Sequence, residues 1–159
     1  MSRIVRADLS LPAHADALIF LLNEYAKDDM GGKQELDEAV KQNLASTLAQ
    51  RPGTHVVMAF VEDAPAALLI SFEGFSTFAC KPLLNIHDVV VLQQFRGRGL
   101  SKQLLAEAEK IAVEQGCCKL TLEVLQGNHI AQAAYTAFGF SGYELSPETG
   151  KAMSWQKAI

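Results

Sequence analysis

Apolar and polar residues alternate with two different periods along the chain. Apolar residues at spacings of three and four predict helices from Pro12 to about Tyr25, from Glu35 to Gln50 and from Leu100 to Gln115. Short apolar runs predict strands over residues 3–7, 55–61, 66–72, 83–92 and 119–124, and a last helix covers 130–138 before a final strand pair at 142–145 and 151–156.

Turn residues separate these segments. Glu62-Asp63-Ala64-Pro65 lies between two apolar strands and predicts a hairpin, whereas residues 73–81 are expected to be a connection. We find no internal repeat, linker or low-complexity segment, so we expect one domain over residues 1–159. The order of elements predicts an α+β (mixed α/β) fold, with helices flanking a mixed sheet.

The 83–92 strand leads into a glycine-rich and doubly basic turn, Arg96-Gly97-Arg98-Gly99, which opens the helix from Leu100. A helix N-terminus presents unpaired N–H groups and a partial positive charge, so it attracts anions such as phosphates. The glycines let the backbone approach a ligand closely. Neither the P-loop pattern nor the dinucleotide pattern is present. Taken alone, two glycines are more simply explained by a plain strand-to-helix turn.

A second motif changes that balance. Arg96-Gly97-Arg98-Gly99-Leu100-Ser101 resembles the [Arg/Gln]-x-x-Gly-x-[Gly/Ala] signature of the GNAT superfamily of N-acetyltransferases, although Ser101 stands where Gly or Ala is usual. Downstream, Asn128-x-x-Ala131-x-x-Ala134-Tyr135-x-x-x-Gly139-Phe140 is similar to the second motif of the same superfamily. The resemblance implies a single-domain GNAT-like fold, in which a mixed, mostly antiparallel central sheet is flanked by about four helices and the 83–92 and 119–124 strands splay apart.

The resemblance also implies an activity. It implies transfer of the acetyl group of acetyl-CoA, a co-substrate, to a primary amine of a small molecule, by direct attack in a ternary complex. Protein N-termini or lysines are alternative acceptors, and a non-catalytic acyl-CoA-binding or sensing module is an alternative of a different kind. The residues implied to contact the cofactor are Val89, Val90, Val91, Arg96, Gly97, Arg98, Gly99, Leu100, Ser101, Lys102, Asn128 and Tyr135.

Acyl transfer to an amine needs a proton acceptor for the ammonium group and a proton donor for the leaving thiolate. By resemblance Tyr135 is the donor, although it could instead be a core aromatic residue. Glu123, at the end of a predicted strand, is the leading candidate for the base. Residues that could act as rival bases or attract a cationic acceptor are Asp28, Asp29, Glu73, His87 and Asp88. Asn128 could contact the cofactor or cap the following helix.

Net charge and residue composition limit the kinds of partner that we expect for this protein. A net charge of −4 opposes bulk attraction to nucleic acid or to an anionic membrane surface, so we expect neither as a partner. No apolar run is long enough to span a membrane and no signal peptide is recognised, so we expect a cytoplasmic protein, which could form a homodimer. The scattered histidines predict no metal site, and the three cysteines are expected to be reduced and mostly buried.

Overall fold

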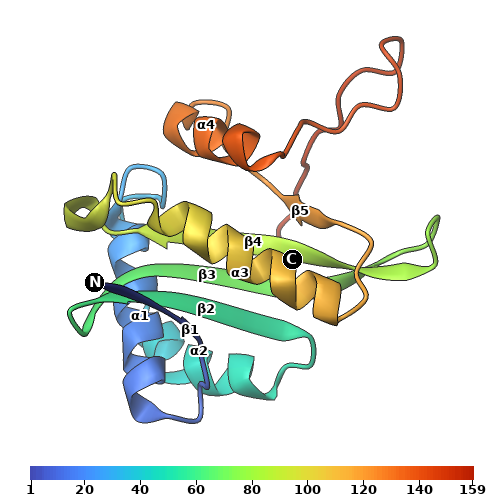
Figure 1. Cartoon of the computed structure of the whole chain (residues 1–159). Helices are drawn as coiled ribbons and strands as arrows, with labels where there is room; N and C mark the ends of the chain where they lie inside the picture. Colours follow the sequence, from blue (N-terminus) through green and yellow to red (C-terminus); the bar gives the residue numbers. More distant parts are fainter. The chain divides into compact units, whose positions relative to one another are not determined.

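The computed structural model describes all residues from Met1 to Ile159. They form two compact units, Met1–Leu122 and Glu123–Ile159 (Figure 1). The first unit contains the sheet and three of the α-helices, and the second contains one α-helix and the C-terminal residues.

The first unit is built around a five-stranded sheet with the order β1-β2-β3-β4-β5. Strands β1 to β4 are antiparallel and β5 is parallel to β4, so the predicted mixed, mostly antiparallel sheet is confirmed. The elements are β1 (Ser2–Arg6), α1 (Pro12–Lys27), α2 (Glu38–Gln50), β2 (Thr54–Val61), β3 (Ala64–Ser76), β4 (Lys81–Val91), the short 3₁₀ turn η1 (Gln93–Phe95), α3 (Leu100–Glu114) and β5 (Leu120–Leu122).

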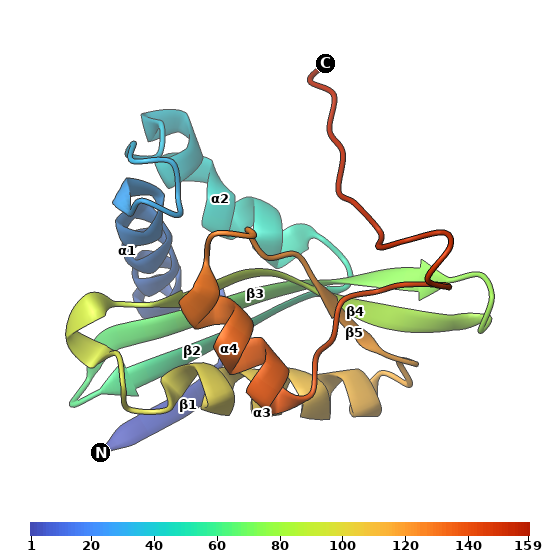
Figure 2. The ribbon, with the colours of Figure 1, turned by 90° about the horizontal axis from the view of Figure 1, so that it is seen from above.

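Helices cover both faces of this sheet. Figure 2 shows α1 and α2 on one face and α3 on the other. Side chains from α1, α2 and alternate positions of β2, β3 and β4 form one core cluster, with members Ala17, Leu18, Leu21, Leu48, Val56, Met58, Phe60, Leu68, Ile70, Val90 and Leu92. On the opposite face, α3 buries the predicted apolar stripe, Leu100, Leu104, Leu105, Ala108, Ile111 and Ala112. This burial fixes both helix layers to the sheet.

The predicted hairpin between β2 and β3 is confirmed. Glu62 and Asp63 both have positive φ, as a tight two-residue hairpin turn requires. A second hairpin is longer than expected. Residues 73–81 were expected to connect two strands, but β3 continues to Ser76 and β4 begins at Lys81, because these strands keep pairing through the interval.

Strand β4 contains a bulge at its centre. Ile70 of β3 pairs with Asp88, whereas the next residue, Ser71, pairs with Ile86, so His87 is an extra residue in β4. Strand β5 pairs with β4 only from Leu84 to Ile86. It is therefore shorter than the predicted 119–124 strand, and the outer edge of β4 beyond the bulge has no strand beside it.

Helix α2 begins at Glu38 rather than at Glu35. The backbone N–H of Leu36 donates to Oδ1 of Asn23 in α1, at 2.9 Å. This hydrogen bond holds the preceding residues against α1, so the helix starts after them. The rest of the predicted helix is confirmed.

The second unit contains α4 (His129–Phe138), close to the predicted helix. The predicted strand pair at 142–145 and 151–156 is wrong. Glu144 and Lys151 form one isolated antiparallel bridge, supported by a 3.0 Å hydrogen bond from the N–H of Ala152 to the carbonyl of Tyr143. Two short strands without a further sheet partner are only marginally stable, which explains why the pairing does not extend.

The expected burial of the cysteines is also wrong. All three are free thiols, but Cys80 and Cys118 are exposed and only Cys117 is partly buried. Cys80 lies in the β3–β4 turn with a positive φ of 51°, and Cys118 lies in the loop after α3. Both sites are in connections at the surface, where apolar periodicity carries no information.

Candidate active site

The glycine-rich turn has the geometry of an anion site. Gly97 and Gly99 have φ values of 76° and 72°, in the left-handed region that favours glycine. A Cβ added to either residue would meet nothing within 4 Å, so both glycines border open space. Gly99 is the N-cap of α3 and no side chain caps the helix. The first helical hydrogen bond runs from the N–H of Gln103 to the carbonyl of Gly99, at 3.1 Å.

Consequently the N–H groups of Leu100, Ser101 and Lys102 have no partner within the helix. The buried side chain of Leu100 anchors the start of α3 in the core, so these donors are held in place. The residues of this turn therefore fit a pyrophosphate group, which accepts several hydrogen bonds and carries the charge that a helix N-terminus favours.

The three cations near the turn differ in their surroundings. Lys102 is exposed and makes no ion pair. The guanidinium of Arg98 lies over the ring of Phe95, 5.5 Å from its centroid. The guanidinium of Arg96 donates from Nη2 to Oδ2 of Asp28 and from Nε to the carbonyl of Val91, both at 3.2 Å. Two of the three cations are thus positioned by other groups.

The end of β4 presents backbone groups beside this turn. The N–H of Leu92 donates to the carbonyl of Ala66 in β3, at 3.0 Å, so the backbone of Leu92 faces β3. Because successive residues of a strand face opposite sides, Val89 and Val91 face the outer edge, which lacks a strand partner. Val90 faces β3 with its backbone, and its side chain is buried in the core. Of the three valines expected to contact a cofactor, only two turn their backbone outward.

The bulge brings polar residues to the face covered by α1 and α2. Asp88 pairs with Ile70, a member of that core cluster, and is partly buried. Burial raises the pKa of the Asp88 carboxyl, and the neighbouring His87 opposes this shift. The ring of His87 packs edge-on against Phe72, with centroids 5.5 Å apart. An ionisable group with a raised pKa and no hydrogen-bond partner in the chain is typical of a functional position.

Tyr25 of α1 completes this region, and the sequence analysis missed it. Tyr25 is partly buried against the core cluster. Burial raises the pKa of its phenol, and the negative charges of Asp88 and Asp28 raise it further. Asp28 and Asp88 therefore both lie within electrostatic range of Tyr25, although Asp88 is far from Tyr25 in the sequence. The only sequence signal was an aromatic residue at the end of a helix, which is usually a packing residue.

Two expected acceptor-binding residues have other side-chain partners. Glu73 is on the opposite face of the sheet from Asp88 and accepts a 2.7 Å contact from Nε2 of His55. Asp29 is exposed and forms a 3.2 Å ion pair with Lys33 within its own turn. The structure thus places Asp28 and Asp88 near Tyr25 and puts Glu73 on the other face of the sheet, whereas the Asp29 carboxylate is paired with Lys33.

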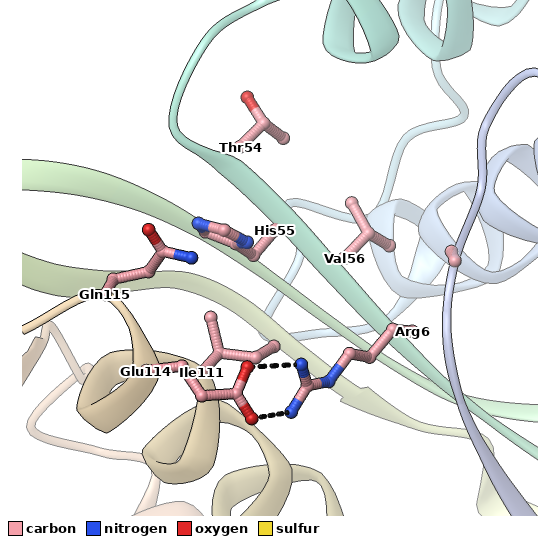
Figure 3. A pocket seen from close by; sticks show the side chains of 8 residues that line it. Arg6, Thr54, His55, Val56, Ile111, Glu114 and Gln115 are labelled. Atoms are coloured by element: carbon pink, nitrogen blue, oxygen red, sulfur yellow. Dashed lines mark hydrogen bonds and ion pairs between the residues drawn. The ribbon is translucent and has the colours of Figure 1, made fainter.

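A small hollow on the α3 face is a poor candidate. It has a volume of about 110 Å³ and is lined by Arg6, Ala7, Thr54, His55, Val56, Ile111, Glu114 and Gln115 (Figure 3). The guanidinium of Arg6 makes two hydrogen bonds to Glu114, at 2.6 and 2.8 Å, and one to Glu107, at 2.7 Å. Its charge is therefore already neutralised by carboxylates and is not free for an anionic ligand. The buried Oγ1 of Thr54, which also lines the hollow, has no hydrogen-bond partner, but a single hydroxyl does not make a binding site.

The second unit carries the remaining expected residues. Oδ1 of Asn128 accepts a 3.2 Å hydrogen bond from the N–H of Ala131, so Asn128 caps α4. Tyr135 is partly buried on α4, and its ring packs edge-on against Phe140 with centroids 6.0 Å apart. Glu123 is exposed, and its Oε1 accepts a 3.0 Å hydrogen bond from Ser154.

The side chains and helices also bear on metal binding and on membrane insertion. No group of three or more His, Cys, Asp or Glu side chains is placed to hold a metal ion. None of the helices combines the length and the apolar character needed to cross a membrane.

Comparison with known proteins gives consistent results. The sequence model of the acetyltransferase (GNAT) family matches residues 18–140. A thialysine N-epsilon-acetyltransferase of Caenorhabditis elegans is 27% identical over 124 residues, which cover 78% of this chain and 75% of that protein. An aminoglycoside N(6′)-acetyltransferase type 1 of Salmonella typhimurium is 32% identical over 63 residues, which cover 40% of this chain and 43% of that protein.

A solved structure shares the fold. The structure of AAC(6′)-Iy in complex with a bisubstrate analogue, CoA-S-monomethyl-acetylneamine, superposes with a TM-score of 0.77 at 17% sequence identity. The match covers 100% of this chain and 99% of that one. The N-terminal helices and the sheet thus follow a known arrangement, even where sequence identity is low.

Proposed function

Because the chain belongs to the acetyltransferase (GNAT) family, we propose that it acetylates a primary amine of a small molecule by direct attack in a ternary complex. It is an acetyl-CoA-dependent N-acetyltransferase. The observation that carries the proposal is the turn at Gly97 and Gly99, where unpaired N–H groups at the start of α3 adjoin the outer edge of β4.

This geometry supports the following contacts with the cofactor. The N–H groups at the start of α3, together with Lys102 and Arg98, bind the pyrophosphate of CoA. The outward-facing backbone of Val89 and the N–H of Val91 pair with the amide groups of the pantetheine arm, as a strand partner would. The N–H groups at this edge also provide donors for the oxyanion that forms during acyl transfer.

The acceptor is a small molecule that carries a primary ammonium group. Such a group has a pKa near 10.4, so a base must remove its proton before the nitrogen can attack. Asp88 is suited to this role because its carboxyl is partly buried, belongs to β4 next to Val89 and is not neutralised by an ion pair. Its raised pKa makes it a better proton acceptor near neutral pH. Glu123 remains the alternative base.

The reaction then proceeds by exchange of one bond for another. The amine nitrogen forms a bond to the carbonyl carbon of the thioester, and the carbon–sulfur bond breaks. One ammonium proton passes to the carboxylate base before the attack, and Tyr135 donates its phenolic proton to the leaving thiolate. The attacking nitrogen then loses a second proton, which restores the phenol of Tyr135, and the base releases its proton to solvent. The named relatives act on thialysine and on aminoglycosides, both of which carry primary amines, and this supports a small cationic acceptor.

A thiol-release assay tests the proposal. Acetyl-CoA is supplied with thialysine, with an aminoglycoside that has a 6′-amine, or with a lysine-containing peptide. We expect release of the CoA thiol above the hydrolysis background with at least one of the two small amines, and a matching acetylated product by mass spectrometry. Release only with the peptide would favour a protein acetyltransferase, and CoA binding without release for any amine would favour a sensing module.

A further inference from the structure

We propose that Arg96 is a positioning residue for the acceptor-side turn and not a ligand of the cofactor phosphates. This inference rests on the proposed function, since it assigns Arg96 a role toward the amine. Sequence reasoning had placed Arg96 with the phosphate-binding cations, because it opens the glycine-rich signature. Its side chain instead joins the end of α1 to the end of β4.

Asp28 is the C-cap residue of α1 and organises the turn that follows this helix. Its carbonyl accepts hydrogen bonds from the N–H groups of Gly31 and Lys33, at 2.9 and 3.2 Å. Its Oδ1 accepts from the N–H of Met30, at 3.3 Å, and its Oδ2 accepts from Arg96. One residue therefore both shapes the turn over 28–33 and links it to the cofactor-side turn.

The other partner of Arg96 is Val91, the last residue of β4. The carbonyl of Val91 faces the outer edge of β4, where a cofactor arm would pair, but it accepts the Nε–H of Arg96 at 3.2 Å. Arg96 thus uses two of its five donors, in the fixed fork of a guanidinium, to hold the last residue of β4 and Asp28 at the same time. A lysine in its place carries the same charge but cannot reproduce this fork.

The contact between Arg96 and Asp28 affects the region where we propose that the amine acceptor binds. Tyr25, three residues before Asp28, lies within electrostatic range of Asp88. The turn over 28–33 packs tightly on the end of the same helix, since a Cβ on Gly31 would lie 1.9 Å from the Tyr25 carbonyl oxygen. If Arg96 releases Asp28, the turn and the end of α1 that carries Tyr25 loosen, whereas the donors at the start of α3 remain in place.

A double-mutant cycle tests the proposal. The variants are Arg96→Lys, Asp28→Asn and the double variant, with KM for the amine, kcat and the Kd of CoA measured for each. We expect a rise of roughly three- to tenfold in KM for the amine in each single variant, as for a charge-assisted hydrogen bond at a partly exposed site. The double variant should be no worse than either single variant, and kcat and the Kd of CoA should stay within about twofold, the scatter of near-additive sites.

A matched control uses another Arg–Asp pair of the first unit. Arg3 and Asp63 lie 3.8 Å apart at the exposed edge of the sheet. Arg3→Lys and Asp63→Asn should leave KM for the amine unchanged. A loss of CoA affinity in Arg96→Lys, additive effects in the double variant, or an unchanged KM in both single variants would each overturn the positioning role.

Hydrogen exchange keeps this test separate from that of the enzymatic activity. Without any substrate, amides of residues 28–36 should exchange faster in Arg96→Lys and in Asp28→Asn than in the wild type, while those of α3 should be unchanged. Faster exchange with no acetyl transfer by the wild type would contradict the proposed function and leave the link intact. Unchanged exchange in an active enzyme would contradict the link alone.

Discussion

A Cβ built on Gly31 would lie 1.9 Å from the carbonyl oxygen of Tyr25 and 2.7 Å from its carbonyl carbon. Because both neighbours are backbone atoms, they cannot move aside as a flexible side chain would. Gly31→Ala should therefore displace the turn over 28–33 and lower the free energy of unfolding by about 1–3 kcal/mol, as overpacking does.

Urea denaturation checks this prediction. Gly142→Ala is a suitable control, because a Cβ there would meet nothing within 4 Å and the residue does not require a positive φ. Its effect should stay within about 0.5 kcal/mol. Equal stability of both variants would show that the turn can move away without cost.

Substitutions in the glycine-rich turn should lower the affinity for CoA. Gly99→Val places a β-branched residue in the left-handed region and fills the open space beside the donors of α3. Lys102→Glu reverses the charge of an exposed cation at the same helix start. Both should weaken CoA binding by calorimetry at low salt, with Gly99→Val the more severe. For Lys102→Glu we expect roughly a five- to thirtyfold increase in Kd, from about 1–2 kcal/mol of helix-terminus electrostatics.

Lys81→Glu is the charge-matched control for Lys102→Glu. Lys81 is exposed at the first residue of β4, and Val91 is at its last. Ten residues of strand at about 3.3 Å each separate them by roughly 33 Å, beyond the reach of screened charge interactions. Comparable loss of affinity in both variants would indicate a general charge effect and would argue against a phosphate site at the turn.

Replacement of Asp88 should change stability and activity in opposite directions. Burial raises the pKa of its carboxyl in the folded state, so the ionised form is disfavoured there. The native protein therefore binds more protons than the unfolded chain between the two pKa values, and this group's contribution to stability falls as pH rises through that window. Asp88→Asn removes the penalty. It should be equal to or more stable than the wild type at pH 7 and gain nothing below pH about 3, under the unfolded aspartate pKa.

Acetyl transfer by Asp88→Asn should nevertheless fall by about 10²–10⁴-fold, the usual contribution of a general base. Urea denaturation at the two pH values and the thiol-release assay measure the two quantities. Glu123→Gln, assayed in parallel, distinguishes the two candidate bases. Full activity of Asp88→Asn together with loss in Glu123→Gln would transfer the role to Glu123.

Removal of the Tyr135 hydroxyl should slow departure of the CoA thiolate. Tyr135→Phe retains the ring and its edge-on contact with Phe140, and removes only the hydroxyl. Folding and CoA affinity should change little, while kcat falls by about 10²–10⁴-fold. The basic limb of the pH–rate profile should also move or disappear. An active variant with an unaltered profile would return Tyr135 to a packing role.

Arg6 makes a prediction about acid stability that is independent of catalysis. Its hydrogen bonds lower the pKa of Glu114, and Lys110 and then Arg6 lower the pKa of Glu107. Such a contribution is present above the unfolded glutamate pKa and is lost as pH falls through the lower folded value. Arg6→Gln should thus be less stable than the wild type at pH 7, and the two should converge at acid pH once both carboxylates of the folded protein are protonated. A difference that persists at acid pH would show that Arg6 acts through packing.

The elements that could be predicted from sequence are those whose signal is local. The apolar stripe of α3, the hairpin at Glu62-Asp63 and the glycines that open α3 each reflect a short-range requirement, which a single stretch of chain expresses in full. The two separated motifs also indicated the family, and the fold class followed. The C-terminal strand pair failed because pairing depends on a neighbouring sheet that its own sequence does not encode.

The candidate site was predictable only in part, since its residues come together through the tertiary structure. Side-chain direction in a strand reverses with every residue, so the one extra residue at His87 decides which face Asp88 occupies. Composition cannot reveal that Glu73 lies on the other face, or that Tyr25 approaches Asp88 from a helix more than sixty positions away. Likewise the sequence shows that Arg96 is charged, but it does not show its partner. Asp28 becomes that partner because α1 packs against the sheet, which brings the end of α1 close to the end of β4.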